Sequence, residues 1–227
     1  VALDSINLEV KEGETRGIIG PNGSGKTTLV NVITGYLPPT SGEVFLRDEK
    51  ITGLNPYDIV RRGIGRTFQI PKVFPALTVF ENICVAAQVK TGHTKSLTPL
   101  PKLKETKEIV EETLEILGLS PKADEQAMNL SAGEIKILEF GMALSQDPSI
   151  LILDEPTSGI SPYEREKVLD VIKKVSKQKT IVVIEHSMDV IMSIAEIVTV
   201  LNKGKIIAEG TPSEIIEMDE IQRIYLT

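Results

Sequence analysis

Eight consecutive residues near the start of the chain have the residue types and spacing of a phosphate-binding loop. They fit the pattern G-x-x-x-x-G-K-[ST] and are Gly20, Pro21, Asn22, Gly23, Ser24, Gly25, Lys26 and Thr27. An apolar run at residues 17–19 precedes them, and a helical pattern over residues 28–33 follows. The glycines let successive main-chain N–H groups curl around an anion, and the beginning of the helix adds a partial positive charge. The stretch therefore predicts a site for phosphate groups.

Two side chains of this loop would act on a bound nucleotide. Lys26 is expected to reach the β- and γ-phosphates, and the hydroxyl of Thr27 is expected to hold Mg²⁺. Thr28, the next residue, completes the predicted nucleotide-binding stretch. A chance match in a glycine-rich turn is the alternative, but a strand before and a helix after are the context that such a loop requires.

A second group of candidate residues lies where an apolar stretch ends in two carboxylates. Residues 151–153, Leu-Ile-Leu, are followed by Asp154 and Glu155. Ligands bind at the carboxyl ends of parallel strands, so both carboxylates are expected beside the phosphate loop. Asp154 would hold Mg²⁺ directly or through water, and Glu155 would accept a proton from an attacking water. The alternative is that both residues only cap the loop that leads to Pro156.

Residues 130–134, Leu-Ser-Ala-Gly-Glu, contain the Ser-x-x-Glu pattern of a capping box. The pattern predicts that Ser131 and Glu134 open a helix that runs to about Ser145. The free N–H groups at the beginning of such a helix can bind an anion, and the hydroxyl of Ser131 adds a donor. The box alone is weak evidence for a ligand site, because ordinary helix starts carry it more often.

Taken together and in this order, these elements resemble the ATP-binding subunits of ABC transporters, over practically the whole chain. The resemblance implies that ATP and Mg²⁺ are bound and that ATP hydrolysis powers membrane transport. It implies that Gln69 senses Mg²⁺ and contacts the membrane partner, and that His186 contacts the γ-phosphate. It also implies a signature that binds the ATP of the opposite subunit in a head-to-tail homodimer or heterodimer. The signature residues are Ser131, Ala132, Gly133 and Glu134.

Three short phrases are more specifically similar to the ATPases of branched-chain amino-acid importers. They are Arg-Thr-Phe-Gln at residues 66–69, Leu-Thr-Val-Phe-Glu-Asn at residues 77–82 and Ile-Glu-His-Ser-Met at residues 184–188. Lipopolysaccharide-export ATPases share much of this pattern and remain the alternative. The resemblance implies transmembrane permease subunits as partners and an indirect link to an external solute-binding protein. It implies a peripheral location on the cytoplasmic face of the cell membrane.

Three features depart from the family pattern. Ala132 stands where the signature usually has glycine, but φ is negative at the start of a helix, so binding is expected to survive. Ser161 stands where the family usually has an aspartate; it can cap the helix before Pro162, but the missing charge puts the coupling of two sites in doubt. The aromatic residue that stacks on adenine in the family would lie upstream of Val1, and the chain is expected to have lost its natural start.

The composition excludes several classes of protein. Of 227 residues, 41% are hydrophobic and 25% are charged, which is typical of a soluble globular protein. No apolar run reaches the ~18 residues of a membrane span, and no signal peptide is visible, so a cytoplasmic protein is predicted. The net charge of -7 disfavours nucleic acid and anionic lipid as partners. The single Cys84, between Ile83 and Val85, is expected to be a buried hydrophobe.

Hydrophobic periodicity and turn residues predict the elements that position these groups. Strands are predicted on both sides of a turn at residues 12–13, the second at 15–19, and at 43–46, 150–153, 180–184, 197–201 and 205–209. Helices are predicted to end at about Thr34, to span residues 55–63, 78–89 and 109–117, and to begin at Ser131, Ser161 and Thr211. Residues 91–104 are predicted to form a loop, with His93 as an exposed bystander.

The predicted fold class is α/β: a P-loop NTPase core with a mainly parallel sheet, an antiparallel β part and an inserted helical subdomain. Residues 1–75 and 149–227 would form the ATP-binding core, and residues 76–148 the helical subdomain with the signature. Residues 69–77 lie at this boundary and are made irregular by Pro71 and Pro75. A regular element cannot easily bury all of their apolar side chains, which are Ile70, Val73, Phe74 and Leu77. We expect them to receive a short helix of the membrane partner, the alternative being that they belong to the core.

Rival functions predict features that the sequence does not show. A soluble ABC ATPase for DNA repair or assembly would carry a coiled-coil insertion or a basic surface. A regulatory nucleotide-binding module without turnover would suit Ser161 and Ala132, but Glu155 and His186 argue against it. A small-molecule kinase would not need residues 130–134. Hydrolysis of ATP that drives a permease is therefore the predicted function.

Overall fold

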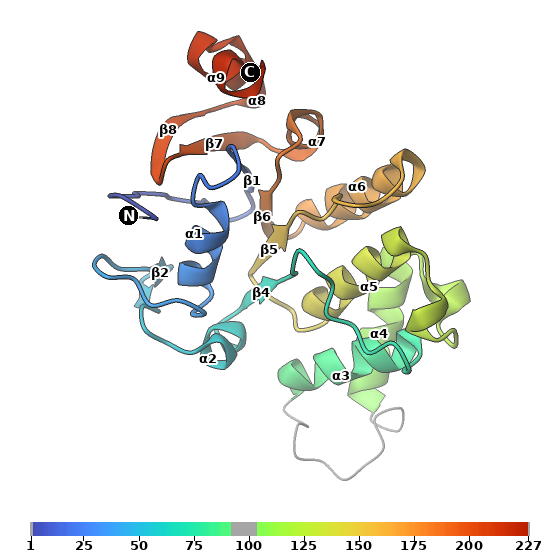
Figure 1. Ribbon diagram of the computed structural model, residues 1–227. Helices are drawn as coiled ribbons and strands as arrows, with labels where there is room; N and C mark the ends of the chain where they lie inside the picture. Colours follow the sequence, from blue (N-terminus) through green and yellow to red (C-terminus); the bar gives the residue numbers. More distant parts are fainter. Residues whose placement is uncertain (1, 92–103, 227) are drawn as a thin grey trace.

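The computed structural model describes residues 2–91 and 104–226, which are built around one six-stranded sheet (Figure 1). Its strand order is β4-β5-β6-β1-β7-β8, and neighbouring strands are parallel except β7 and β8, which are antiparallel. The strands are β1 (Thr15–Ile19), β4 (Ile64–Arg66), β5 (Ile150–Asp154), β6 (Thr180–Ile184), β7 (Ile197–Asn202) and β8 (Lys205–Gly210). The predicted α/β fold with a mainly parallel sheet is confirmed.

The central strands β5, β6 and β1 are buried on both faces, as their continuous apolar runs predict. Alternate side chains of a strand point to opposite faces. Leu151, Leu153 and Val183 accordingly belong to one apolar cluster, whereas Ile152 and Val182 belong to another. Two separate cores therefore hold the sheet, one on each face.

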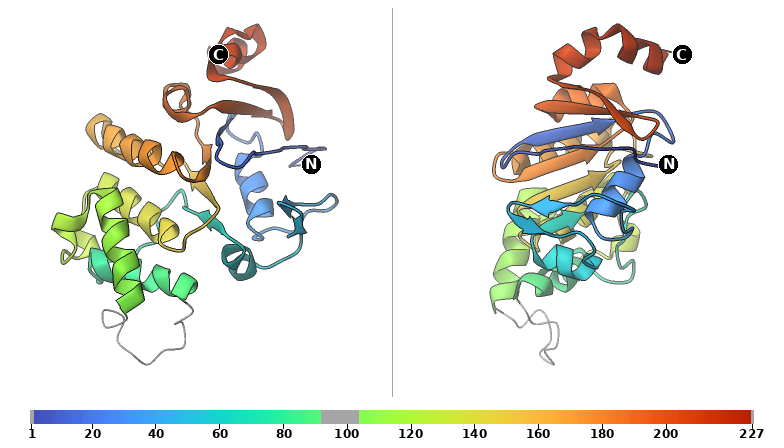
Figure 2. Two further views of the ribbon diagram at one scale, coloured as in Figure 1. Left: turned by 180° about the vertical axis from the view of Figure 1, so that it is seen from behind. Right: turned by 90° about the vertical axis from the view of Figure 1, so that its left-hand side faces the viewer.

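Helices cover both faces of this sheet. Figure 1 shows α1 on one side and α5 and α6 on the other, with α3 and α4 beyond α5, and Figure 2 shows the same arrangement from behind and from the side. The helices are α1 (Lys26–Ile33), α2 (Pro56–Arg61), α3 (Val79–Thr91), α4 (Lys104–Leu117), α5 (Ala132–Leu144), α6 (Pro162–Ser176), α7 (Met188–Ile194), α8 (Pro212–Glu217) and α9 (Asp219–Leu226). Leu29 and Val30 of α1 pack in one core, and Leu138 of α5 and Ile172 of α6 pack in the other.

The predicted helix starts are confirmed by their hydrogen bonds. Ser131, Ser161 and Thr211 each form a reciprocal capping box with the glutamate three residues later. Thr78 and Glu81 exchange the same pair of hydrogen bonds before α3. Each box satisfies main-chain donors that have no partner within the helix, so these helix starts are determined by local sequence.

Several predictions of secondary structure are wrong. Residues 2–14 form no strand; their apolar side chains Leu3, Ile6 and Leu8 pack half-buried against the core on the α1 side without joining the sheet. The strand predicted at residues 43–46 is reduced to β2 (Phe45–Leu46), which pairs only with β3 (Glu49–Lys50) in a small separate sheet. The elements β4, α7 and α9 were not predicted, because each is a short run whose pattern depends on tertiary packing.

Two further predictions concern single side chains. Cys84 is fully buried in α3, and burial raises the pKa of its thiol to about 11, so the predicted role as a small buried hydrophobe is confirmed. His93 and most of the loop predicted at residues 91–104 lie outside the described residues. Within the described ranges, no helix has the length and apolar character needed to cross a membrane.

Candidate functional site

The predicted phosphate loop connects β1 to α1. Gly23 and Gly25 adopt positive φ angles of 77° and 109°, a left-handed conformation that favours glycine. The main-chain N–H groups of Gly23, Gly25, Lys26 and Thr27 donate to no acceptor in the part of the chain that the structure describes. The Ser24 hydroxyl is buried and is likewise without a partner there. These unpaired donors fit a ligand with several anionic oxygens.

The Lys26 side chain folds back over this loop. Its Nζ donates to the carbonyl oxygens of Gly20 at 2.7 Å and Pro21 at 3.1 Å. Burial lowers the pKa of the Lys26 ammonium, and the nearby carboxylates of Glu155 and Asp154 act in the opposite direction. The ammonium is thus held among main-chain carbonyls at the edge of the loop, beside both predicted carboxylates.

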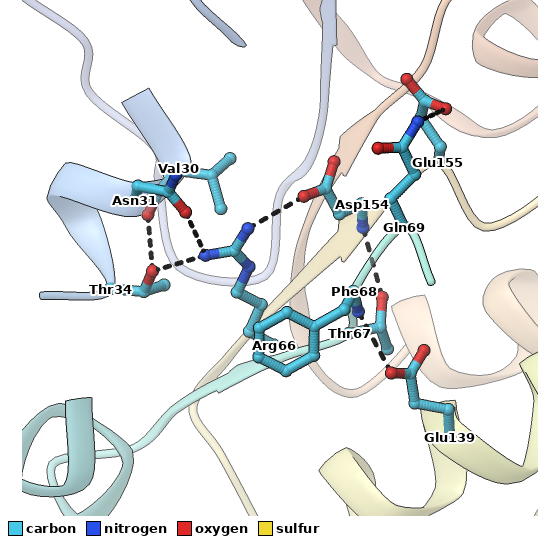
Figure 3. A network of polar contacts seen from close by, with 10 residues as sticks. All are labelled: Val30, Asn31, Thr34, Arg66, Thr67, Phe68, Gln69, Glu139, Asp154 and Glu155. Carbon is cyan, nitrogen blue, oxygen red and sulfur yellow. Dashed lines mark hydrogen bonds and ion pairs between the residues drawn. The ribbon is translucent and has the colours of Figure 1, made fainter. Parts of the chain in front are cut away.

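The two carboxylates at the end of β5 lie in different surroundings. Asp154 is buried and accepts from the guanidinium of Arg66 at 3.0 Å, as Figure 3 shows. Glu155 is half-buried and has a positive φ of 48°, which is uncommon for a residue with a side chain. The bend at Glu155 turns its carboxylate away from the strand. Both carboxylates lie at the end of this strand, as the sequence predicts, and Asp154 is the more buried of the two.

The structure brings Gln69 to Glu155, although 86 positions in the sequence separate them. Gln69 follows β4 on an irregular segment, and its Nε2 donates to Glu155 Oε2 at 2.9 Å (Figure 3). The contact arises because β4 is the parallel neighbour of β5, so both chains leave the sheet at the same edge. An amide and a carboxylate that are hydrogen-bonded beside a phosphate loop can orient a water and accept its proton.

His186 follows β6, the other neighbour of β5. Its imidazole is exposed, and its Nδ1 lies 3.7 Å from the Oε2 of the fully buried Glu185. Glu185 also accepts from the main-chain N–H and the hydroxyl of Thr157, at 3.0 and 2.7 Å. A main-chain bond of 2.9 Å from Glu155 N to Ile184 O ties the ends of both strands together. His186 is therefore available at the same edge of the sheet as Glu155.

The beginning of α5 lies apart from this group. No hydrogen bond or ion pair of the described residues connects positions 131–134 with the phosphate loop. The main-chain N–H of Gly133 donates instead to Glu164 of α6 at 3.1 Å. A β-carbon at Gly133 would come within 2.6 Å of the β-carbon of Glu164, so this position requires glycine. Ala132 is exposed, and nothing in the structure opposes its methyl group.

Three residues of the site were not singled out from the sequence. Arg66 donates to Asn31 at 2.8 Å and to Thr34 at 2.9 Å, both on or next to α1, and its guanidinium lies over the ring of Phe68. Lys136 and Glu139 of α5 contact the main chain around Gln69. The available signal was weak: Glu139 is one carboxylate among the apolar neighbours of its helix, and Arg66 ends a short strand that was not predicted.

The described residues contain no group of three or more His, Cys, Asp or Glu side chains arranged to hold a metal ion. Thr27, Asp154 and Gln69, the three predicted metal ligands, are a hydroxyl, a carboxylate and an amide. Such hard oxygen donors suit Mg²⁺, which in phosphate-binding sites takes few protein ligands and keeps oxygens of the phosphates. The chemistry of this donor set therefore fits a magnesium ion that arrives with a nucleotide.

Comparison with known proteins identifies the family. Residues 3–158, more than half of the chain, match the family described as "ABC transporter". The high-affinity branched-chain amino acid transport ATP-binding protein LivG of Escherichia coli (strain K12) is 38% identical over 234 aligned positions, covering 100% of this chain and 92% of LivG. Many other proteins also match this chain.

Solved structures agree with this result. A nucleotide-free ATP-binding cassette from an ABC transporter superposes with a TM-score of 0.87 at 33% identity, covering 100% of this chain and 93% of that chain. An ATP-binding cassette of an ABC transporter in its ADP conformation gives 0.85 at 33% identity, with 99% and 92% covered. The resemblance to ABC ATP-binding subunits is confirmed. The chain belongs to the ABC transporter family, as a subunit that binds and hydrolyses ATP to power transport.

Proposed function

We propose that this protein powers the import of branched-chain amino acids. The observation that carries the proposal is the similarity to LivG, a branched-chain amino acid transport ATP-binding protein, along the full length of the chain. The pairing of Gln69 with Glu155 supports turnover, because it provides a proton acceptor beside a phosphate loop with unpaired donors. The transported solute is recognised by partner chains, so similarity in the ATPase supports the solute class indirectly.

The residues of the site divide the work of ATP hydrolysis. The unpaired N–H groups at Gly23, Gly25 and Lys26 bind the phosphate oxygens, and the Lys26 ammonium moves from its carbonyl partners to the β- and γ-phosphates. Glu155 accepts the proton of the attacking water, which contributes a factor of ~10²–10⁴ to the rate. Gln69 orients that water, and the exposed imidazole of His186 donates to the γ-phosphate.

Thr27, Asp154 and Gln69 would hold Mg²⁺ in this site. When bound, the ion neutralises charge on the phosphates. Asp154 is now bonded to Arg66, and it has a second carboxylate oxygen that can serve a ligand. The nucleotide stretch ends with Thr28, which is half-buried in the first turn of α1.

The signature implies that two copies, or one copy and a related ATPase, form a head-to-tail dimer. Ser131 caps α5, which begins with Ala132, Gly133 and Glu134, and among the described residues no hydrogen bond or ion pair joins this helix start to the phosphate loop. A second subunit would bring its own nucleotide to this helix start, where the positive end of the helix dipole favours an anion. The N–H groups of Gly133 and Glu134, which now bond to Glu164 and Ser131, would have to exchange these partners to bind it directly. A closed pair with two-fold symmetry follows from two such sites.

The membrane partner is proposed to be a permease, which would hold the protein on the cytoplasmic face of the membrane and link it indirectly to an external solute-binding protein. Ile70 and Phe74 support a docking surface at residues 69–77, since 74% and 46% of their areas are exposed. Val73 in the same segment packs against the core instead. Both the docking alternative and the core alternative thus apply, to different residues of this segment.

The division into a core of residues 1–75 and 149–227 and a helical subdomain of residues 76–148 also remains a proposal. The contacts among α3, α4 and α5 support it, because these three helices pack on one another, and α5 also packs on β4 and β5 of the sheet. The irregular segment after β4 would then be the joint between the two parts.

Uptake of radiolabelled leucine tests the proposal. Cells that lack the gene should regain leucine uptake with the wild-type protein but not with Glu155→Gln. Uptake of an unrelated solute in the same cells serves as the control. Normal leucine uptake in the gene-deleted cells, together with loss of another solute's uptake, would refute the solute class while leaving the ATPase assignment intact.

A further inference from the structure

Lys136 and Glu139, about one turn apart on α5, form hydrogen bonds with the main chain of residues 68–72, which we call the Gln69 segment. The carboxylate oxygen Oε1 of Glu139 accepts from the main-chain N–H of Lys72 at 2.8 Å and of Phe68 at 3.3 Å; the bond to Phe68 is drawn in Figure 3. Lys136 Nζ donates to the carbonyl oxygen of Gln69 at 3.2 Å. The main chain of Phe68, Gln69 and Lys72 is therefore attached to α5, whereas Thr67 is still hydrogen-bonded to β5.

The Glu139 carboxylate occupies an unfavourable position for an ion. The residue is only 5% exposed, and burial raises the pKa of its carboxyl, while the N–H groups of Lys72 and Phe68 and the ammonium of Lys136 act in the opposite direction. A buried carboxylate persists only where hydrogen bonds compensate for lost solvation. Here those bonds go to an irregular segment that contains Pro71 and Pro75 and forms no helix or strand of its own.

Lys136 holds a second carbonyl oxygen, that of Glu155, at 3.0 Å. One ammonium thus bridges the main-chain carbonyls of the two residues whose side chains meet at 2.9 Å. Glu155 also carries the uncommon positive φ of 48°, a conformation that needs support from its surroundings. The Lys136 contact lies on the peptide unit that follows this bend.

We infer that Lys136 and Glu139 are positioning residues for ATP hydrolysis, which hold Gln69 against Glu155 from the helix that begins at the signature. Their printed contacts go to the main chain of Phe68, Gln69, Lys72 and Glu155, so they would act through the residues that they hold. The inference rests on the proposed roles of Gln69 and Glu155. Because α5 begins directly after its cap residue Ser131, Lys136 and Glu139 connect the helix of the signature to the main chain around Gln69.

A purely structural role is the competing explanation, and a double-mutant cycle separates the two. If Glu139 acts through Gln69, then its removal costs activity only while Gln69 is present. The cycle uses full-length protein with Glu139→Ala, Gln69→Ala and the double variant, and it measures kcat and KM for ATP together with Tm. Misplacing a reacting group by about 1 Å can cost ~10²-fold in rate, so we expect kcat to fall about 10- to 100-fold in Glu139→Ala, with a much smaller change in KM.

The expected result is that the double variant has the kcat of Gln69→Ala alone. Glu139→Gln should keep most of the activity, because both main-chain N–H groups bond to one oxygen that the amide also provides. If Gln69→Ala and Glu139→Ala lower kcat independently, so that their factors multiply, the positioning role is overturned and the role of Gln69 stands. If Gln69→Ala leaves kcat unchanged, the proposed role of Gln69 fails and the positioning role fails with it.

Lys136→Met provides a second test if Glu139→Ala does not fold. The methionine keeps most of the side chain's apolar length but cannot bond the carbonyls of Gln69 and Glu155. We expect kcat to fall about tenfold or more, with Lys136→Arg restoring part of it. Lys173→Met, at an exposed position on α6, is the matched control and should behave as wild type. Equal kcat in Lys136→Met and Lys173→Met would overturn the proposal.

Discussion

The guanidinium of Arg66 donates to the carboxylate of Asp154 at 3.0 Å, and the two side chains are only 8% and 6% exposed. Arg66 also bonds to Asn31 and Thr34, so a single side chain joins the helix of the phosphate loop to the end of β5. A buried ion pair of this kind contributes little net stability, but removing one partner leaves the other charge buried and unpaired. Arg66 therefore determines where Asp154 lies relative to α1.

We expect Arg66→Met to lower the free energy of unfolding by about 3 kcal/mol, because it leaves the Asp154 carboxylate buried without its charged partner. The same substitution at Arg62, whose ion pair with Glu49 is on the surface, should cost only about 0–1 kcal/mol. Urea unfolding of both variants measures the difference. Equal losses of stability in the two variants would contradict the importance of the Arg66–Asp154 pair.

Lys26→Ala and Glu155→Gln should fail in different ways. The first removes a charged phosphate contact, and we expect nucleotide affinity to fall about 10- to 100-fold. The second removes the proton acceptor but preserves the shape of the site, so affinity should persist while turnover falls ~10²–10⁴-fold. Fluorescent-nucleotide titration and phosphate release distinguish these outcomes. Wild-type turnover in Glu155→Gln would show that this residue is not the base.

ATP should promote dimer formation, because in the described residues the beginning of α5 is not hydrogen-bonded to the phosphate loop of its own chain and would bind the nucleotide of a second subunit. Glu155→Gln binds ATP without consuming it and should trap the dimer in saturating ATP and Mg²⁺. Light scattering of full-length protein measures this, with Lys26→Ala, which binds ATP poorly, as the control that stays monomeric. A Glu155→Gln protein that binds ATP but remains monomeric would disprove the shared site.

Acid should weaken the helix caps. The hydroxyl and main-chain N–H of Ser161 lower the pKa of Glu164 to about 2, from an ordinary value of 4.5. A lowered folded-state pKa contributes stability above the unfolded value, and this contribution is lost as pH falls from about 4.5 to about 2. Glu164→Gln should therefore lower Tm at pH 7 but narrow the difference in Tm between pH 7 and pH 3.

The control for Glu164→Gln is Glu166→Gln, which removes one exposed charge from the same helix without touching the cap. If both variants show the same dependence of Tm on pH, then the cap of α6 does not contribute to acid sensitivity.

Phe74→Asp should separate ATP hydrolysis from transport. Phe74 is exposed beside the Gln69 segment, so a charge there should leave basal hydrolysis nearly intact while abolishing co-purification with the permease and solute uptake. Phe45→Asp changes another exposed phenylalanine, on β2, and is the matched control. Unimpaired uptake by a folded Phe74→Asp protein would exclude this docking surface, and failure of the variant to fold would favour a core role.

Structural features that depend on residues close together in the sequence were predictable from it. The phosphate loop, the boundaries of β5 and β6 and the capping boxes at Ser131 and Ser161 arise from short-range patterns, and the structure has them where they were expected. Residues 2–14 show the limit of such patterns: their alternation of apolar side chains suits a strand, but no neighbouring strand in the described sheet pairs with them.

The available chemistry could be predicted from the sequence: a loop of N–H donors, a lysine, and carboxylates at the end of a buried strand. Which of these groups meet depends on tertiary packing. Three contacts join positions 67 to 88 residues apart: Arg66 with Asp154, Gln69 with Glu155, and the main chain of Lys72 with Glu139. Their pairing follows from β4 lying beside β5 and from α5 packing on both, and no local pattern specifies that arrangement.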